Sequence, residues 1–473
     1  MRTETTRATS IHKVRRRALG NKRARGHEFQ RQGRRVRRLA PEAIRRGPVD
    51  KSLSGVGGLA PFGRYARRIG LDRQLHGLFG ELKTGRKVVY PMGTQLRLLV
   101  DANVVGEDRV FGVEMLGADP LFLALAGGSV PSIDTLYRDL CRFEATDLAK
   151  LEVLMAYHGI EEVGSRQLDV VHLDIDTTVE PLFGTQEGAL PGYNPRYHGQ
   201  PSYHPLLAVV AETGTCVGAR LRPGDRNFGD ADAKDIRAYV DRARAAVGSD
   251  ARLVVRIDGA ADCTEILEQI HDAGAHFLVK ARLTPELLGA LVATKQWTTV
   301  DWDADGQAVR QVAEIRFARE EWKRRSLPVR VIAVRSTEHD VGKQTMLWPE
   351  LDYAVQVYLA SDKDTAIEDL AIEYNGRAEI EPTIAELKGA LGLGKVPSQS
   401  FNANHAAFLI KLLSHNLVKR YVRAVAPEAA TWRLPWLRRA LFTVPARFVR
   451  SARRWSIRVP PHSTLHAVMC RLE

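Results

Sequence analysis

The sequence has little cysteine and no long apolar run. Its four cysteines are scattered through 473 residues with no C-x-x-C spacing, which argues against a zinc ribbon or a disulfide scaffold and favours a reducing compartment. No stretch reaches about 18 apolar residues, and residues 1–47 lack the apolar segment of a secretory signal. We therefore expect a cytoplasmic protein that does not enter a membrane.

Negative charge is scarce at both ends of the chain. The formal net charge is +13; residues 1–47 hold 16 Lys/Arg against three acids, and residues 419–458 hold 11 against Glu428 alone. The segment between them therefore carries a net charge of about −10. Basic ends around an acidic middle suit a protein that binds nucleic-acid phosphates on both sides of a metal-dependent pocket. The Arg-rich segment 1–47 is expected to be a disordered arm.

Two apolar runs each end in an aspartate. Residues 167–176 alternate with period 2, so that Val171, Leu173 and Ile175 share one face and His172, Asp174 and Asp176 the other. Residues 252–258 form a second run, which ends in Asp258. A single strand-end aspartate is more often a turn or cap residue. Two such strands can also deliver carboxylates to one sheet edge, where Mg²⁺ prefers hard oxygen ligands.

Four polar residues near the end of the chain have helical spacing. Tyr374, Arg377, Glu381 and Lys388 are offset by 3, 7 and 14 residues, or about 300°, 340° and 320° around a helix. The spacing predicts one narrow face, with a kink or a new helix at Pro382. A charged helix face is usually just solvated. Together with the two strand-end aspartates, this face predicts a site that holds metal ions against a phosphate.

These residues together resemble the DDE transposases of bacterial insertion sequences. Asp-Thr-Thr at 176–178, Asp258 and the Tyr-x2-Arg-x3-Glu-x6-Lys pattern at 374–388 are similar to that group and to its "YREK" signature. The stretches Ser54–Gly63 and Asn402–Phe408 are similar to the insertion-sequence thirteen-eighty family. The resemblance covers roughly residues 50–455 and implies a cut-and-paste transposase (transposase DDE domain group 1) that is cytoplasmic and associated with the bacterial nucleoid.

The resemblance also implies roles for individual residues. Asp176, Asp258 and Glu381 would hold two Mg²⁺ ions, for which Mn²⁺ can substitute. Arg377 and Lys388 would clamp phosphates, and Tyr374 would contact the DNA backbone. The substrate would be double-stranded DNA, both transposon ends and target, bound by a homodimer.

Two departures leave alternatives open. The family usually has Ser-Gly-Phe after its second aspartate, whereas this chain continues Asp258-Gly-Ala-Ala-Asp262, so Asp262 is a rival ligand. Asp174 shares the face of Asp176 and is the other rival. A ribonuclease H-like nuclease without strand transfer would use the same acids, and a non-catalytic DNA-binding relic of a transposase is a third possibility.

The expected fold is α/β: a ribonuclease H-like core interrupted by a β-rich insertion and preceded by an α-helical DNA-binding region. In that region, residues 119–143 resemble a helix–turn–helix whose second helix exposes Arg138 and Arg142 for DNA. The expected segments are the arm at 1–47, helical domain at 52–150, core at 165–282, insertion at 283–360, second part of the core with the Glu helix at 361–418, and basic C-terminal region at 419–473.

Tryptophan and arginine are concentrated in two further places. The insertion contains Trp297, Trp302, Trp322 and Trp348. The resemblance implies that an aromatic residue of the insertion stacks on a base flipped from the transposon end, although core packing is the more common role of any one tryptophan. The C-terminal run from Trp432 to Trp455 interleaves aromatic residues with arginine. This pattern suits contacts with DNA or a second subunit, or equally a solvated basic helix. The arginines of the run are Arg438, Arg439, Arg447, Arg450, Arg453 and Arg454.

Overall fold

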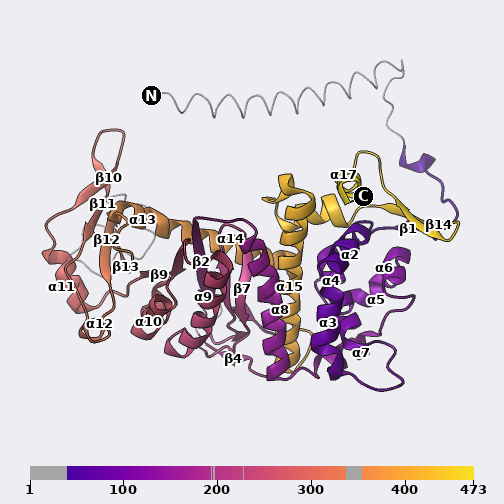
Figure 1. Cartoon of the computed structure of the whole chain (residues 1–473), viewed down its shortest axis with the longest axis horizontal. Helices are drawn as coiled ribbons and strands as arrows, with labels where there is room; N and C mark the ends of the chain where they lie inside the picture. Colours follow the sequence, from indigo (N-terminus) through magenta and orange to yellow (C-terminus); the bar gives the residue numbers. More distant parts are fainter. Residues whose placement is uncertain (1–39, 193, 195–197, 227, 337–353, 473) are drawn as a thin grey trace, which may run out of the picture. The chain divides into compact units, whose positions relative to one another are not determined.

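The computed structural model (Figure 1) describes residues 40–472 apart from 193, 195–197, 227 and 337–353. The contacts between residues divide the chain into two compact units, with the boundary between Lys51 and Ser52. The helices and strands described below all belong to the second unit. Most of the predicted arm, residues 1–39, and Trp348 of the predicted insertion lie outside the described residues.

A nine-stranded mixed sheet forms the centre of this unit, in the order β10-β11-β12-β13-β9-β8-β2-β6-β7. The two predicted strands that end in aspartate form β2 and β8, which lie side by side and parallel. Strand β9 continues the parallel arrangement beside β8, whereas β6 and β7 are an antiparallel hairpin beside β2. The bounds are β2 (Val170–Thr177), β6 (Leu206–Val210), β7 (Thr215–Arg220), β8 (Arg252–Ile257) and β9 (His276–Lys280).

The predicted β-rich insertion continues the same sheet. Strand β13 pairs antiparallel with β9, and β12, β11 and β10 follow outward (Figure 1). Trp322 is fully buried in this part, whereas Trp302 is exposed on β10. The elements are α11 (Pro285–Ala293), β10 (Thr298–Trp302), β11 (Ala308–Glu314), α12 (Glu320–Arg324), β12 (Arg330–Ser336) and β13 (Ala354–Ala360).

Apolar residues of alternating strand positions pack against helices α9 (Ala233–Val247) and α10 (Thr264–Asp272). Val171, Leu173 and Ile175 are completely buried there, as the period-2 pattern predicted. The opposite face of β2 therefore carries the polar residues, and the site is built on that face.

A second core joins the N-terminal helices to the long helix α15 (Phe401–Val425). Both α8 and α4 pack on α15, so residues from 56 to 468 share one apolar cluster. The predicted helix pair is present as α6 and α7, capped at Asp119 and Ser132. The helices are α2 (Leu59–Arg68), α3 (Leu71–Phe79), α4 (Met92–Val105), α5 (Gly112–Leu116), α6 (Pro120–Leu125), α7 (Ile133–Leu140) and α8 (Ala145–Gly164).

The basic C-terminal run forms a hairpin rather than a helix between residues 446 and 458. Strands β14 (Ala446–Ser451) and β15 (Arg454–Arg458) pair with each other, and β14 also pairs with β1 (Leu53–Ser54). The glycine-rich stretch after β1 allows this close approach, because a Cβ on Gly58 would lie 1.8 Å from the Leu441 carbonyl oxygen. Short helix α16 (Leu434–Leu437) and helix α17 (Thr464–Leu472) flank the hairpin in sequence.

No helix in the described part of the chain combines the length and apolarity that crossing a bilayer requires.

Candidate active site

Two aspartates lie together at one end of the parallel strand pair. Ile175 of β2 is in register with Ile257 of β8, so the next residues, Asp176 and Asp258, lie side by side where the pairing of these two strands ends. Asp176 still pairs with Leu207 of β6. The Asp258 carboxylate accepts a hydrogen bond from the Ala260 amide at 3.0 Å, and Asp176 accepts one from Thr177 at 2.8 Å. Both side chains are half-buried. The sheet therefore presents two carboxylates at one edge.

Residues 374–388 do not form one continuous helix; of the two alternatives predicted at Pro382, the new helix is the one that forms. The chain instead forms α13 (Ile367–Asn375), a 3-10 turn (Gly376–Glu379) and α14 (Ile380–Leu391). Helix α14 begins two residues before Pro382, so the proline lies in its first turn, where an N–H would have no intrahelical acceptor. The proline marks a new helix, not a kink. Glu381 consequently stands exposed at the beginning of α14.

The other three residues of the predicted stripe contact the ends of the strands. Arg377 Nη2 lies 3.1 Å from Asp176 Oδ1. Lys388 Nζ lies 3.2 Å from Glu180 Oε1 and donates to the Val179 carbonyl at 2.8 Å. The Tyr374 hydroxyl donates to the carbonyl of Ile257, immediately before Asp258, at 3.3 Å.

Tyr374 is itself buried, with its ring centroid 4.2 Å from that of Tyr358. These contacts hold α13 and α14 against β2 and β8. The DNA contacts of Tyr374, Arg377 and Lys388 stay predictions.

The three predicted ligands are electrostatically coupled. Burial raises the pKa of Asp176 to about 6; the Arg377 guanidinium opposes this rise, and the carboxylates of Asp258 and Glu381 add to it. Burial likewise raises the pKa of Tyr374 to about 12. The charge of the nearby Arg377 opposes this rise, and the charges of the aspartates add to it. Burial and the neighbouring carboxylates together thus outweigh the effect of Arg377 on the pKa of Asp176.

Both rival carboxylates form two-point ion pairs with arginine. Asp174 is buried and accepts from Arg256 at 2.6 and 2.8 Å. Asp262 accepts from Arg319 at 2.6 and 2.7 Å. Paired oxygens of this kind are poorly available to a metal ion. The arrangement favours Asp176 and Asp258 over Asp174 and Asp262.

A charged network beneath the site was not expected from the sequence. His172 contacts Glu212 at 2.6 Å and Glu373 of α13 at 2.7 Å. Arg252 reaches the same Glu373 carboxylate at 2.6 and 2.9 Å, and Arg256 donates to the Glu373 carbonyl at 2.7 Å. The network fixes α13 on the sheet. Its sequence signal was the period-2 polar face of β2, matched by Arg252 and Arg256 on β8.

Arg438 is half-buried and fixes helix α14, although the sequence placed it among possible DNA contacts. Its guanidinium donates to the carbonyls of Asn103 at 2.6 Å and Val104 at 3.2 Å, at the end of α4, and to Ala390 near the end of α14. Burial lowers its pKa to about 10. One cation thus caps the C-termini of two helices, where carbonyl groups and the helix dipole favour positive charge.

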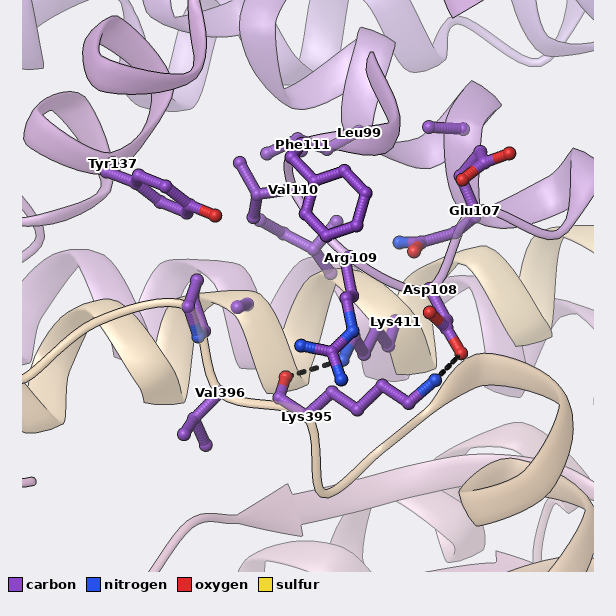
Figure 2. Close-up of a pocket in the computed structure, with 15 residues that line it drawn as sticks. Leu99, Glu107, Asp108, Arg109, Val110, Phe111, Tyr137, Lys395, Val396 and Lys411 are labelled. Carbon is purple, nitrogen blue, oxygen red and sulfur yellow. Dashed lines mark hydrogen bonds and ion pairs between the residues drawn. The ribbon is translucent and has the colours of Figure 1, made fainter. Parts of the chain in front are cut away.

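A small cavity of about 50 Å³ lies beside the loop that follows α14 (Figure 2). Lys411 points into this region and donates to the carbonyls of Gly392 at 2.6 Å and Lys395 at 2.9 Å. Burial lowers the pKa of Lys411 to about 7. The lysine anchors the loop that terminates α14, and the strand-end carboxylates do not line this cavity.

Arg138 and Arg142 are exposed, as predicted for the second helix of the pair. Arg138 lies on α7, and Arg142 lies two residues beyond its end. The Arg142 guanidinium donates to Asp139 at 2.8 Å. Their contact with DNA stays a prediction.

The donor chemistry at the edge suits Mg²⁺, because the carboxylates supply hard oxygens and the coupled negative charge favours a cation. Between residues 40 and 472, outside the gaps given above, no three His, Cys, Asp or Glu side chains converge closely enough to enclose a metal ion. Arg377 contributes the positive charge nearest to Asp176 in this arrangement.

The family model of the transposase DDE domain group 1 matches residues 47–472, and the chain therefore belongs to this transposase family. Members of the family generally use divalent metal ions. No curated protein matches the chain. Among solved structures, a piggyBac transposase in a synaptic complex with hairpin DNA is similar at 10% identity and a TM-score of 0.44, over 81% of this chain and 79% of that one.

Proposed function

We propose that this transposase moves an insertion sequence by cutting both of its ends and joining them to target DNA. The observation that supports this proposal best is the side-by-side position of Asp176 and Asp258 at the ends of β2 and β8, together with the effect of the Glu381 charge on the pKa of Asp176. The strand order β7-β6-β2-β8-β9 supports a ribonuclease H-like core. The resemblance to the thirteen-eighty family and its YREK pattern supports the cut-and-paste route.

Asp176, Asp258 and Glu381 would hold two Mg²⁺ ions. Bound there, the ions would supply the charge that activates a water and stabilises the leaving 3′ oxygen. Closure of the site requires α14 to bring Glu381 closer to the strand ends, because no closed ligand cluster exists among the described residues. Tyr374 and Arg438 then act as positioning residues, since they tie α13 and α14 to their supports.

Arg377 changes partner in this proposal. It now lies 3.1 Å from Asp176, and its buried Nε has no partner among the residues that the structure describes. Release from Asp176 would leave the guanidinium free to bind a DNA phosphate beside the scissile bond. Lys388 would follow the same course from Glu180. Each cation thus balances a carboxylate before DNA binds and a phosphate afterwards.

Both ends of an element must be cut in one complex, so we propose a homodimer on DNA. A ribonuclease H-like nuclease would use the same carboxylates without joining strands, and it remains the second candidate. A non-catalytic relic is third, and the presence of all three acids speaks against it.

The test is cleavage of a labelled duplex carrying the DNA that flanks this gene, with Mg²⁺. Glu381→Gln and Asp176→Asn are compared with Glu379→Gln, an exposed carboxylate two residues from Glu381. We expect end-specific nicking and strand transfer by the wild type and by Glu379→Gln, and neither by the two site variants, with DNA binding retained.

Nicking without transfer would favour the nuclease. Binding without any cleavage by the wild type, in Mg²⁺ or Mn²⁺, would favour the relic.

A further inference from the structure

A β-hairpin near the C-terminus gathers arginine on one face. This basic hairpin comprises residues 446–458, the strands β14 and β15 and their turn (Figure 1). In its register Arg447 lies directly opposite Arg458, and Ser451 opposite Arg454, so these residues share one face. Arg453 lies in the turn itself. The face and tip therefore present four guanidinium groups.

Negative charge is missing around three of these arginines, Arg453, Arg454 and Arg458. Residues 429–472 contain no aspartate or glutamate. Within the described part of the chain, no carboxylate forms an ion pair with Arg453, Arg454 or Arg458, and all three are exposed. Arg453, Arg454 and Arg458 therefore concentrate uncompensated positive charge at the tip and on β15.

The turn itself has an unfavourable conformation. Ala452 has φ 47° and Arg453 has φ 65°, the left-handed conformation that a two-residue turn of this type needs and that asparagine and glycine supply best. Alanine and arginine adopt it less readily. Their presence places a long cation, not a small turn residue, at the tip.

The opposite face braces the hairpin. Phe448 and Trp455 stack with centroids 4.5 Å apart and planes 8° apart, and the Arg450 guanidinium lies 5.6 Å from the Trp455 ring. Ile457 on the same face lies against the glycine-rich stretch at Gly57. Apolar and cation–π contacts thus stabilise one face, while Arg454 and Arg458 on the other face are exposed.

The hairpin is also linked to the catalytic helix. It follows the helical segment Arg438–Phe442, and Arg438 at the beginning of that segment donates to Ala390 of α14. The amides of Gly57 and Gly58 bond to the carbonyls of Val444 and Phe442 at 3.0 and 3.1 Å, which fixes the base of the hairpin.

We propose that the basic hairpin binds the phosphate backbone of double-stranded DNA. The proposal rests on the proposed function, in which DNA is the substrate, and it assigns to residues 446–458 a phosphate-binding surface apart from the carboxylate site. A two-stranded ribbon is narrow enough to enter a major groove, with its outward arginines against the phosphates. Contacts of this kind add affinity that does not depend on base sequence and decreases with salt.

The test uses the full chain and a fluorescent duplex of arbitrary sequence, without divalent ions, between about 50 and 200 mM salt. The variant is Arg453→Gln/Arg454→Gln/Arg458→Gln. Its charge-matched control is Arg220→Gln/Arg237→Gln/Arg325→Gln, three arginines that are paired with carboxylates. Thermal unfolding checks the fold of both.

We expect the hairpin variant to bind roughly 10- to 100-fold more weakly, and the slope of log affinity against log salt to decrease in magnitude by about 3, close to one for each lost phosphate contact. The control should keep the slope of the wild type. Arg453→Gln alone should lower it by about 1.

If the wild type binds the duplex and the triple variant has the same salt slope, the assignment of DNA binding to the hairpin would be overturned, and the proposed function would stand. Weaker binding that tracks loss of a dimer in light scattering would also overturn that assignment, because the hairpin would then be a subunit interface. A wild-type chain that binds no duplex would overturn the proposed function and this assignment together.

Discussion

The strand-end site and the basic hairpin use arginine in opposite ways. At the strand ends, Arg256 and Arg319 each form a two-point pair with a buried carboxylate, and Arg377 lies against Asp176. In the hairpin, Arg454 and Arg458 have no carboxylate among the described residues to pair with. Paired arginines within the fold determine which carboxylates remain available to bind a metal ion. Unpaired arginines at the surface can bind an anion from outside the chain.

Register creates a second contrast within the site itself. On neighbouring strands Asp174 lies beside Arg256, and one step further along the same face Asp176 lies next to Asp258. The pair of Asp174 and Arg256 is neutral and buried, whereas the pair of Asp176 and Asp258 carries two like charges at the solvent edge. The first stabilises the sheet, and the second is suited to bind a cation. Substitutions in these two residue pairs should therefore have different consequences.

The largest expected effect distinguishes those two residue pairs by the property that each substitution changes, DNA cleavage or stability. Asp176→Asn should lower the rate of DNA cleavage on the order of a thousandfold, because it removes a carboxylate that would hold the metal ions. Its melting temperature should stay near that of the wild type. Asp174→Asn should instead lower the melting temperature, since Arg256 loses its partner. Cleavage assays and calorimetry on both variants test this contrast, and equal loss of activity at unchanged stability would contradict it.

Arg256→Met should destabilise the fold by about 3–5 kcal/mol, because the buried Asp174 is left without a partner. Urea unfolding measures the change. Arg237→Met, which breaks an exposed pair with Asp241, is the control and should cost no more than about 1 kcal/mol. Similar losses in the two variants would show that burial does not set the strength of these pairs.

Arg438→Met should cost about 2–3 kcal/mol, since the carbonyls at the ends of α4 and α14 lose a charged donor. Because α14 carries Glu381, cleavage should decrease as well, whereas DNA affinity should change little. Unfolding and binding measured on the same preparation distinguish this outcome from direct DNA contact. A loss of affinity as large as that of the hairpin triple variant would contradict a purely structural role.

His172 should make stability depend on pH. Burial alone lowers its pKa, but the hydrogen bonds with Glu212 and Glu373 outweigh burial and raise the pKa to about 9. A raised pKa stabilises the protonated folded state, so this contribution is complete below about pH 6.5 and is lost as pH rises through 9.

His172→Gln should therefore cost more at pH 6 than at pH 9.5, with a difference on the order of 1–2 kcal/mol after allowance for solvent screening. Urea unfolding at the two pH values measures it. A difference of the opposite sign would show that the imidazole is neutral in the fold.

The smallest expected effect concerns the hairpin turn. Ala452→Gly should relieve its left-handed conformation and stabilise the hairpin locally by about 0.5–1 kcal/mol. Hydrogen exchange of the amides of β14 and β15 should slow, while exchange of β2 and β8 stays the same. Faster exchange in the hairpin would show that the alanine is not strained.

The prediction from sequence succeeded where the pattern was local and repeated. The strands ending near Asp176 and Asp258 followed from apolar periodicity, and α6 and α7 form the helix pair expected within 119–143. Over 374–388, Pro382 indicated a new helix as one alternative, but spacing alone could not reveal the 3-10 turn between Tyr374 and Glu381. The prediction failed for residues 446–458, where composition indicated positive charge but not a hairpin.

By itself, the sequence determined the residue types of the site and the strands that carry them, because period-2 alternation and turn residues act over a few neighbouring positions. It could not distinguish Asp174 from Asp176, which lie two residues apart on one face. Only the tertiary structure decided between them. The register of β8 brings Arg256 to Asp174 and Asp258 to the end that carries Asp176, and register is set by contacts about 80 residues apart in the chain.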